Sequence, residues 1–198
     1  MSSLSTHQEI WQPSRGKVGM AALIGMECFF FSGFIVAYLY YIGASAHGPF
    51  PRDVLEVKPV IVNSVALLSS SWTVVAAVRA LNTGRVGSMG FWLLITVLLG
   101  TFFIWGTLAE WRTLIYDKGL TISTNLFGST FFALIGFHAF HVCLGLMALS
   151  TVWVLGVLGQ LKPSRDAMRL ELISWYWHFV DVVWIFVFTT VYIVGMRP

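Results

Sequence analysis

Residues 126–159 read LFGSTFFALIGFHAFHVCLGLMALSTVWVLGVLG, an apolar run without a single Asp, Glu, Lys or Arg. A helix needs about 20 apolar residues to cross a hydrocarbon layer of roughly 30 Å. This run has roughly 34 residues, or about 51 Å of helix at about 1.5 Å per residue. It predicts a membrane-spanning helix that tilts or protrudes into water.

Four further apolar runs are long enough to cross a bilayer, at residues 18–43, 59–81, 89–111 and 172–196. The connections between them are short and contain Gly or Pro, which favour turns. Membrane β-strands would alternate in polarity at every second residue, and these runs do not. The sequence predicts an all-α integral membrane protein: a segment at 1–17, then a five-helix membrane domain at 18–198.

The composition agrees with this class. Hydrophobic residues make up 57% of the 198 residues and charged residues 11%, whereas soluble domains are about a quarter charged. The net charge of +3 reflects a few loop Lys and Arg residues and excludes a nucleic-acid-binding face. Cys28 and Cys143 form no CxxC pair and are predicted to be small buried residues.

The basic residues predict an orientation, because cytoplasmic loops carry an excess of Lys and Arg. Seven flank the spans on the side of the N-terminus: Arg15, Lys17, Arg79, Arg85, Lys162, Arg165 and Arg169. Five flank them on the other side: Arg52, Lys58, Arg112, Lys118 and Arg197. We therefore expect a cytoplasmic N-terminus and an external C-terminus.

Glu27 is the clearest polar residue within a predicted span, with no basic residue near it in the sequence. A charged side chain in hydrocarbon costs at least a few kcal/mol, so it needs a partner or a function. We expect a neutral carboxyl group that forms a hydrogen bond to a neighbouring helix. Contact with lipid and proton exchange remain alternatives.

His138 and His141 lie three residues apart and share one face of the fourth span. Paired imidazoles can bind haem or copper, but the second histidine pair of a transmembrane haem site and the Cys–His loop of a binuclear copper site are missing. Hydrogen bonds between helices are the simpler interpretation. We predict no metal site in this chain.

The last span contains residues 175–184, WYWHFVDVVW. His178 and Asp181 are three residues apart, close enough to bond to each other, and Trp177 and Trp184 line one stripe. Polar and aromatic side chains of this kind hold helices together in lipid. A proton relay is the alternative, although one pair does not make a chain across the membrane.

Taken together, three stretches resemble subunit III of the haem–copper respiratory oxidases. Residues 177–184 resemble the start of that family's last helix. Residues 128–132 (GSTFF) and 136–142 (GFHAFHV), with Gly145, are similar to its penultimate helix, and residues 27–31 (ECFFF) to its glutamate-and-aromatics segment. The matches follow the chain in order and cover nearly all of it.

The resemblance implies a non-catalytic subunit of a proton-pumping oxidase that reduces oxygen to water. Such a subunit binds no haem or copper itself. It packs against the catalytic subunit I, with subunit II and in some complexes subunit IV, and holds phospholipids in a cleft that Glu27 would border. His138, His141, His178 and Asp181 match polar motif residues with structural or lipid-contacting roles. Sustained turnover is the expected contribution, and membership of a respiratory supercomplex is left open.

Two departures qualify the resemblance. The common form has seven helices, whereas this chain resembles the five-helix bacterial versions, some of which carry the other two helices on the catalytic subunit. Residues 71–75 (SWTVV) lack histidines that many relatives have there. The motifs look more like cytochrome c oxidases than ubiquinol oxidases, and an accessory subunit of nitric oxide reductase is a more distant alternative.

Two other classes compete with an oxidase subunit. A small transporter or channel would show inverted repeats and helices broken at the midplane. We find no internal repeat, and the prolines lie outside the spans or at the first residue of one, Pro59. A lipid-modifying enzyme would need a nucleophile beside a base, and none is evident. A bacterial inner-membrane location follows from the resemblance.

Overall fold

The computed structural model describes residues 14–196, and this part of the chain is helical without any strand. Its five long helices are α1 (Arg15–Tyr40), α3 (Val57–Asn82), α4 (Val86–Arg112), α5 (Leu126–Val157) and α6 (Pro163–Phe188). A short helix α2 (Pro51–Val54) precedes α3, and the π-helical turns η1 (Thr113–Asp117) and η2 (Thr189–Val194) extend α4 and α6. Each long helix is long and apolar enough to cross a membrane, so the predicted all-α fold with five spans is confirmed.

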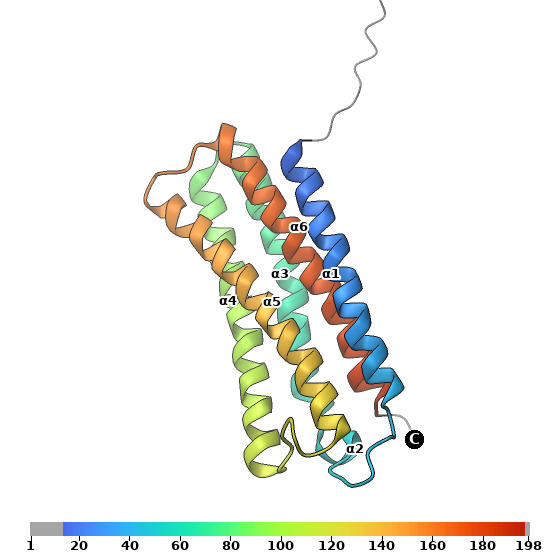
Figure 1. The fold of residues 1–198 in the computed structure, drawn as a ribbon. Helices are drawn as coiled ribbons and strands as arrows, with labels where there is room; N and C mark the ends of the chain where they lie inside the picture. The colour runs from blue at the N-terminus through green and yellow to red at the C-terminus, as the bar shows by residue number, and fades with distance from the viewer. Residues whose placement is uncertain (1–13, 197–198) are drawn as a thin grey trace, which may run out of the picture.

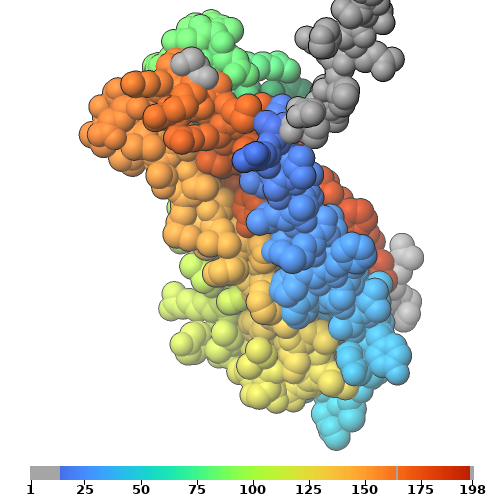
Figure 2. All heavy atoms as spheres, turned by 45° about the horizontal axis from the view of Figure 1, so that its top comes forward, coloured from blue at the N-terminus to red at the C-terminus, as the bar shows by residue number. Residues whose placement is uncertain are grey.

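The long helices form one bundle (Figure 1), and α5 and α6 are the most buried of them. Helix α6 packs against α1, α3 and α5, while α5 also contacts α1 and α4, and α3 and α4 form the most extensive pair. Helix α1 makes its main contacts with α5, α6 and η2. It stands along the outside of the bundle (Figure 2).

Local sequence signals mark the ends of the helices. The Asn125 side chain caps α5 by accepting a hydrogen bond from the backbone N–H of Gly128 at 2.8 Å, and the Ser14 hydroxyl accepts one from that of Lys17 at 3.4 Å. Gly84 and Gly159 follow the C-terminal ends of α3 and α5 with φ of 74° and 68°. Only glycine adopts this conformation without strain, which explains why the helices stop there.

Helix α6 begins at Pro163, well before the predicted start of the last span at residue 172. Its first turns are polar but well paired: Arg169 Nη1 lies 2.9 Å from Asp166 Oδ1, and Lys17 Nζ lies 2.9 Å from Glu171 Oε1. Asp166 Oδ2 also accepts the backbone N–H of Lys162 at 2.9 Å. These contacts stabilise the polar first turns of α6, which lie outside the span predicted from hydropathy.

The two ends of the bundle carry the two predicted sets of basic residues. The start of α1, the α3–α4 connection and the α5–α6 connection lie at one end, and α2 and the loop after η1 lie at the other (Figure 1). The described basic residues of the two predicted sets therefore fall at opposite ends. Residues 1–13 of the predicted N-terminal segment, and Arg197 of the second set, lie outside the described residues, and the orientation itself stays a prediction.

Candidate functional site

The Glu27 carboxyl group on α1 meets His141 on α5. Glu27 Oε2 lies 3.2 Å from His141 Nε2, and the two side chains are only 21% and 9% exposed. A carboxyl group without a basic neighbour in sequence thus finds a partner on another helix. This contact joins the peripheral helix α1 to the inner part of the bundle.

The second nitrogen of His141 defines what this pair can do. Nδ1 lies 2.7 Å from the carbonyl oxygen of Phe137, which can only accept a hydrogen bond, so Nδ1 carries a proton. The remaining proton of the pair then lies between Nε2 and Glu27 Oε2, on one atom or the other. The pair is neutral overall in both arrangements, which is the state that a hydrocarbon environment favours.

Aromatic rings enclose the pair. The ring of Phe31 packs edge-on against His141 with centroids 4.9 Å apart, and Phe30 packs edge-on against Phe137 at 5.2 Å. Tyr176 on α6 donates a hydrogen bond from its hydroxyl to the carbonyl oxygen of His141 at 3.3 Å. The aromatic residues that follow Glu27 in the sequence therefore form one wall of its site.

His138 lies apart from this pair and is fully buried. Its ring stacks on Trp184 with centroids 4.9 Å apart and meets the edge of Phe103 at 5.8 Å. Neither ring nitrogen has a hydrogen-bond partner among the described residues. The prediction of hydrogen bonds between helices is therefore wrong for His138, which contacts its neighbours through its π-face instead.

The two tryptophans of the 177–184 motif join α6 to α3. Trp177 Nε1 donates to Ser70 Oγ, and Trp184 Nε1 donates to Ser64 Oγ, both at 2.8 Å. All four side chains are buried. The later tryptophan, Trp184, pairs with the earlier serine, Ser64, as expected for two antiparallel helices. We call these four residues the α3–α6 seam.

Ser71 connects the two other polar residues of the motif. Its hydroxyl lies 2.9 Å from His178 Nδ1 and donates a hydrogen bond to Asp181 Oδ2. The described residues show no direct bond between His178 and Asp181, so the expected pair is corrected to one bridged through α3. The bridge fixes α6 to α3 at a third point beside the seam.

A narrow apolar groove runs between α1 and α6 just beyond Glu27. It has a volume of about 290 Å³, and its walls include Phe31, Val36, Phe179 and Val183. Cys28 lines it and is exposed, so the prediction of a buried Cys28 is wrong, because α1 is peripheral. The groove could hold a hydrocarbon chain next to the Glu27–His141 pair.

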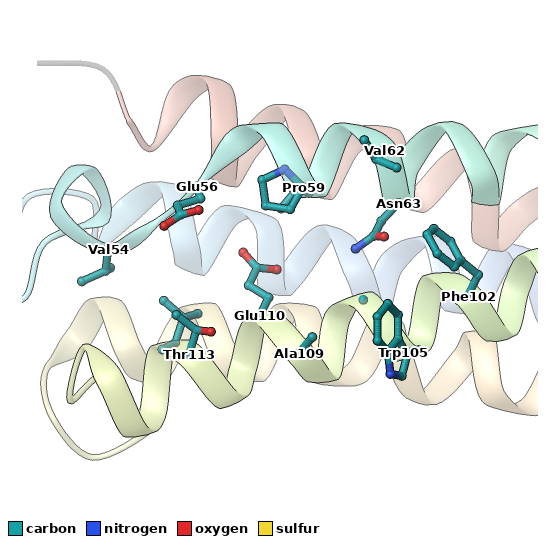
Figure 3. A pocket seen from close by; sticks show the side chains of 13 residues that line it. Val54, Glu56, Pro59, Val62, Asn63, Phe102, Trp105, Ala109, Glu110 and Thr113 are labelled. Atoms are coloured by element: carbon teal, nitrogen blue, oxygen red, sulfur yellow. The ribbon is translucent and has the colours of Figure 1, made fainter.

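A second cavity was not expected from the sequence. It lies between the start of α3 and the end of α4, and its polar lining includes Glu56, Asn63 and Glu110 (Figure 3). Glu110 is noticeable in the sequence as a charge near the end of a span. Asn63 and Glu56 carry no comparable signal, because their meeting with α4 depends on how the two helices are aligned.

The described residues include no group of three or more His, Cys, Asp or Glu side chains that could hold a metal ion. The Glu27–His141 pair can share a proton between Glu27 Oε2 and His141 Nε2, and the Ser71 bridge links two polar side chains. The fold and these contacts define a multi-pass membrane protein whose helices are held together by polar and aromatic contacts.

Comparison with known proteins places the chain within this class. The family model described as cytochrome c oxidase subunit III matches residues 5–196. Cytochrome c oxidase subunit 3 of Bacillus subtilis strain 168 is 34% identical over 179 residues, covering 90% of this chain and 86% of that protein. Quinol oxidase subunit 3 of the same organism is 34% identical over 183 residues, covering 90% and 87%. A probable cytochrome c oxidase subunit 3 of Nocardia farcinica is 33% identical over 185 residues, covering 92% and 90%.

The chain belongs to the cytochrome c oxidase subunit III family. It is subunit III of a terminal oxidase, which confirms the resemblance seen in the sequence. Subunit III of this family is an accessory subunit without metal sites of its own, and it associates with the catalytic subunits of the complex.

Proposed function

We propose that this chain is the non-catalytic subunit III of a bacterial cytochrome c oxidase that reduces oxygen to water and pumps protons. Subunits I and II, and in some complexes subunit IV, are its partners, and the haems and copper lie in those partners. The complex lies in the inner membrane, with the N-terminus of this chain in the cytoplasm. Family membership and the five spanning helices support this proposal.

The Glu27–His141 contact carries the proposed role of this subunit. Glu27 points inward from a helix whose neighbouring residues face outward, including Met26 and the 84% exposed Phe29. The outward residues offer an apolar face to the catalytic subunit or to lipid. The groove beside Cys28 suits the acyl chain of a phospholipid, since its walls are almost entirely apolar. We infer that the chain stabilises the catalytic subunit, retains phospholipid there and supports sustained turnover.

The electron donor is assigned to cytochrome c on the basis of the 27–31 and 175–178 segments. Relatives named as cytochrome c and quinol oxidase subunits have the same 34% identity to this chain, so overall similarity favours neither donor. Oxygen uptake by the purified complex with reduced cytochrome c, compared with ubiquinol, tests the assignment. Faster turnover with ubiquinol would replace it with a quinol oxidase.

Oxygen uptake followed to inactivation tests the supporting role. Glu27→Gln keeps the shape and most of the hydrogen bonding of the side chain, so the initial rate should fall by less than about tenfold, or about 1.4 kcal/mol in the barrier. Glu27→Leu removes the contact with His141, so it should shorten activity over many turnovers more than Glu27→Gln does.

Thr151→Ala on α5 is the control, because the exposed Thr151 hydroxyl bonds only to the Met147 carbonyl of its own helix and lies outside the groove. It should leave both the initial rate and the lifetime unchanged. Loss of the first turnovers in Glu27→Gln, in a complex that still assembles, would place Glu27 in the chemistry and refute an accessory role.

A further inference from the structure

The cavity between α3 and α4 brings polar side chains together near the end of the bundle that carries α2. It has a volume of about 400 Å³. Glu56 and Asn63 line it from the α3 side, and Glu110 points into it from α4 (Figure 3). Phe102 and Trp105 of α4 stand beside Asn63. A ligand that enters the cavity therefore meets two carboxyl groups, one carboxamide group and an aromatic wall.

Asn63 indicates that the cavity takes a polar ligand. It is only 9% exposed and forms no hydrogen bond to another described residue. Its carboxamide lies against Gly106 of α4, where an added Cβ would overlap the amide. Glycine thus makes room for a buried amide whose partner the described residues do not supply. Buried polar groups are almost always hydrogen-bonded, so this amide points to a ligand from outside the chain.

The two carboxyl groups of the cavity also lack a partner of opposite charge. Glu110 accepts hydrogen bonds from the Tyr192 hydroxyl at 2.9 and 3.1 Å, and each of its oxygens keeps a second lone pair. Among the described residues, no Lys or Arg forms a salt bridge with Glu56 or Glu110. An ionisable side chain within a membrane span almost always has a partner. A cationic group from outside the chain would supply it.

Arg112 of this chain does not fill that role. It lines a neighbouring hollow that shares Trp105 with the cavity, and Asp117 lines the same hollow. The hollow therefore contains one residue of each charge. The charged residues among those that line the cavity itself are Glu56 and Glu110, both acidic. The cavity, unlike the hollow, has a charge that favours a cation.

The acceptors of the cavity match a guanidinium group in number and kind. Two carboxylates contribute two oxygens each and the Asn63 carbonyl contributes one, while a guanidinium group has five N–H donors in one plane. That plane also stacks on aromatic rings, such as the indole ring of Trp105, whereas an ammonium group has only three donors. Trp105 is 65% exposed, so the cavity is accessible from the outer face of the α3–α4 pair.

We propose that the cavity is a docking site for an arginine side chain near one end of a transmembrane helix of a partner subunit. Helix α1 makes its main contacts with α5, α6 and η2, whereas α3 and α4 pack against each other and against α5 and α6. The face around the cavity is therefore distinct from the exposed face of α1. The docking site requires only that the chain is part of an oxidase complex, and it is independent of Glu27 and of the electron donor.

The test is photocrosslinking within the purified oxidase complex. The photoreactive amino acid p-benzoylphenylalanine replaces Val62, which lines the cavity and is 59% exposed. It should form an adduct with a membrane-spanning partner subunit, on a segment that contains an arginine, as mapped by mass spectrometry. The same probe in place of Phe29 on α1 should crosslink to a different segment. The absence of an adduct, an adduct with phospholipid alone, or an adduct on a partner segment without arginine would overturn the proposal.

Variants connect the adduct to the cavity, with its yield measured over a series of detergent concentrations that release the partner. Glu110→Gln keeps an acceptor for the Tyr192 hydroxyl, so the double variant Glu56→Gln/Glu110→Gln should fold. It should weaken binding of the partner by about tenfold or more, because charge-assisted hydrogen bonds are lost. Glu171→Gln, which removes a carboxylate at the other end of the bundle, should behave as the wild type does. Equal binding in the double variant and this control would overturn the proposal.

Replacement of the crosslinked partner arginine by glutamine leaves this chain unchanged, so it decides the matter even if the double variant fails to assemble. It should weaken binding to a similar extent, and the double variant should add little to it, because both changes remove the same interaction. Binding as strong as that of the wild type would refute the docking site. Oxygen uptake keeps this outcome separate from the proposed function, since a complex that turns over without the adduct refutes the docking site alone.

Discussion

The spans formed by α1 and by α6 with η2 are similarly apolar, yet only 6% of the most apolar part of α1 is buried in the protein, against 56% of that of α6 and η2. Lipid is as apolar as a leucine side chain, so apolar character alone does not draw a helix into a membrane bundle. The difference lies in the polar and small groups that each helix finds on its neighbours.

Helix α6 reaches α3 through the α3–α6 seam and the Ser71 bridge, whereas inside the membrane α1 has Glu27 as its main polar contact. Close packing adds to this difference, because Trp177 lies against Gly100 and Gly145, while Gly25 and Gly33 of α1 have no neighbour within 4 Å of an added Cβ. Position in the bundle thus follows from specific contacts. Substitutions that compare these two helices test the conclusion.

The largest effect is expected for Trp177→Ala. The change empties a fully buried site and removes the hydrogen bond to Ser70, so it should lower the free energy of unfolding by about 3–5 kcal/mol. Phe29→Ala removes a comparable ring from the exposed face of α1 and should have little effect. Unfolding of the purified chain in mixed micelles measures both. A loss of similar size in the two variants would end the distinction between α1 and α6.

A smaller effect is expected for Gly145→Ala on α5. Its Cβ would lie 2.7 Å from Trp177 Cε3, and a rigid indole ring cannot yield easily. Overpacking of this kind costs about 1–3 kcal/mol. Gly33→Ala on α1 is the control, with open space around its Cβ, and should be neutral or slightly stabilising. Equal stability of the two variants in the same unfolding assay would show that the Trp177 site can expand.

The smallest effect concerns the Ser71 bridge. Ser71→Ala removes both of its contacts with α6 and should cost about 0.6–2 kcal/mol. Asp181→Leu should then add little in the Ser71→Ala background, since the two residues share one contact. Ser69→Ala should be silent, because the Ser69 hydroxyl donates only to the Val65 carbonyl of its own helix. Full additivity of Ser71→Ala and Asp181→Leu would favour the direct His178–Asp181 pair expected from the sequence.

The spans could be predicted from the sequence because hydropathy is a local property, and helix ends followed from local signals such as Asn125 and Gly84. The spacing of Trp177 and Trp184 also indicated a shared stripe. Contacts between helices could not be predicted in the same way. The three-residue spacing of His178 and Asp181 suggests a direct pair, and only the alignment of α3 with α6 inserts Ser71 between them.

The surroundings of individual polar side chains could not be predicted from the sequence either, because they depend on contacts between helices. A buried histidine can satisfy a hydrogen bond or stack on a ring, and the sequence around His138 does not distinguish the two. Asn63 meets Gly106 only because α3 and α4 have a particular register. The peripheral position of α1 could not be predicted from hydropathy. Cys28 lies in a run as apolar as those of the inner helices, yet it is exposed.

The α3–α6 seam has a consequence for how the protein is made. Ser70 and Trp177 are 107 residues apart, so at about 5–20 residues per second the ribosome delivers the tryptophan roughly 5–20 s after the serine. During that interval α3 has been synthesised but α6, which carries Trp177, has not. The Ser70 hydroxyl donates to the Leu67 carbonyl of its own helix, which keeps its proton satisfied before α6 arrives. Its oxygen then remains free to accept the indole N–H, so Ser70 can bond to Trp177 without giving up the bond to Leu67.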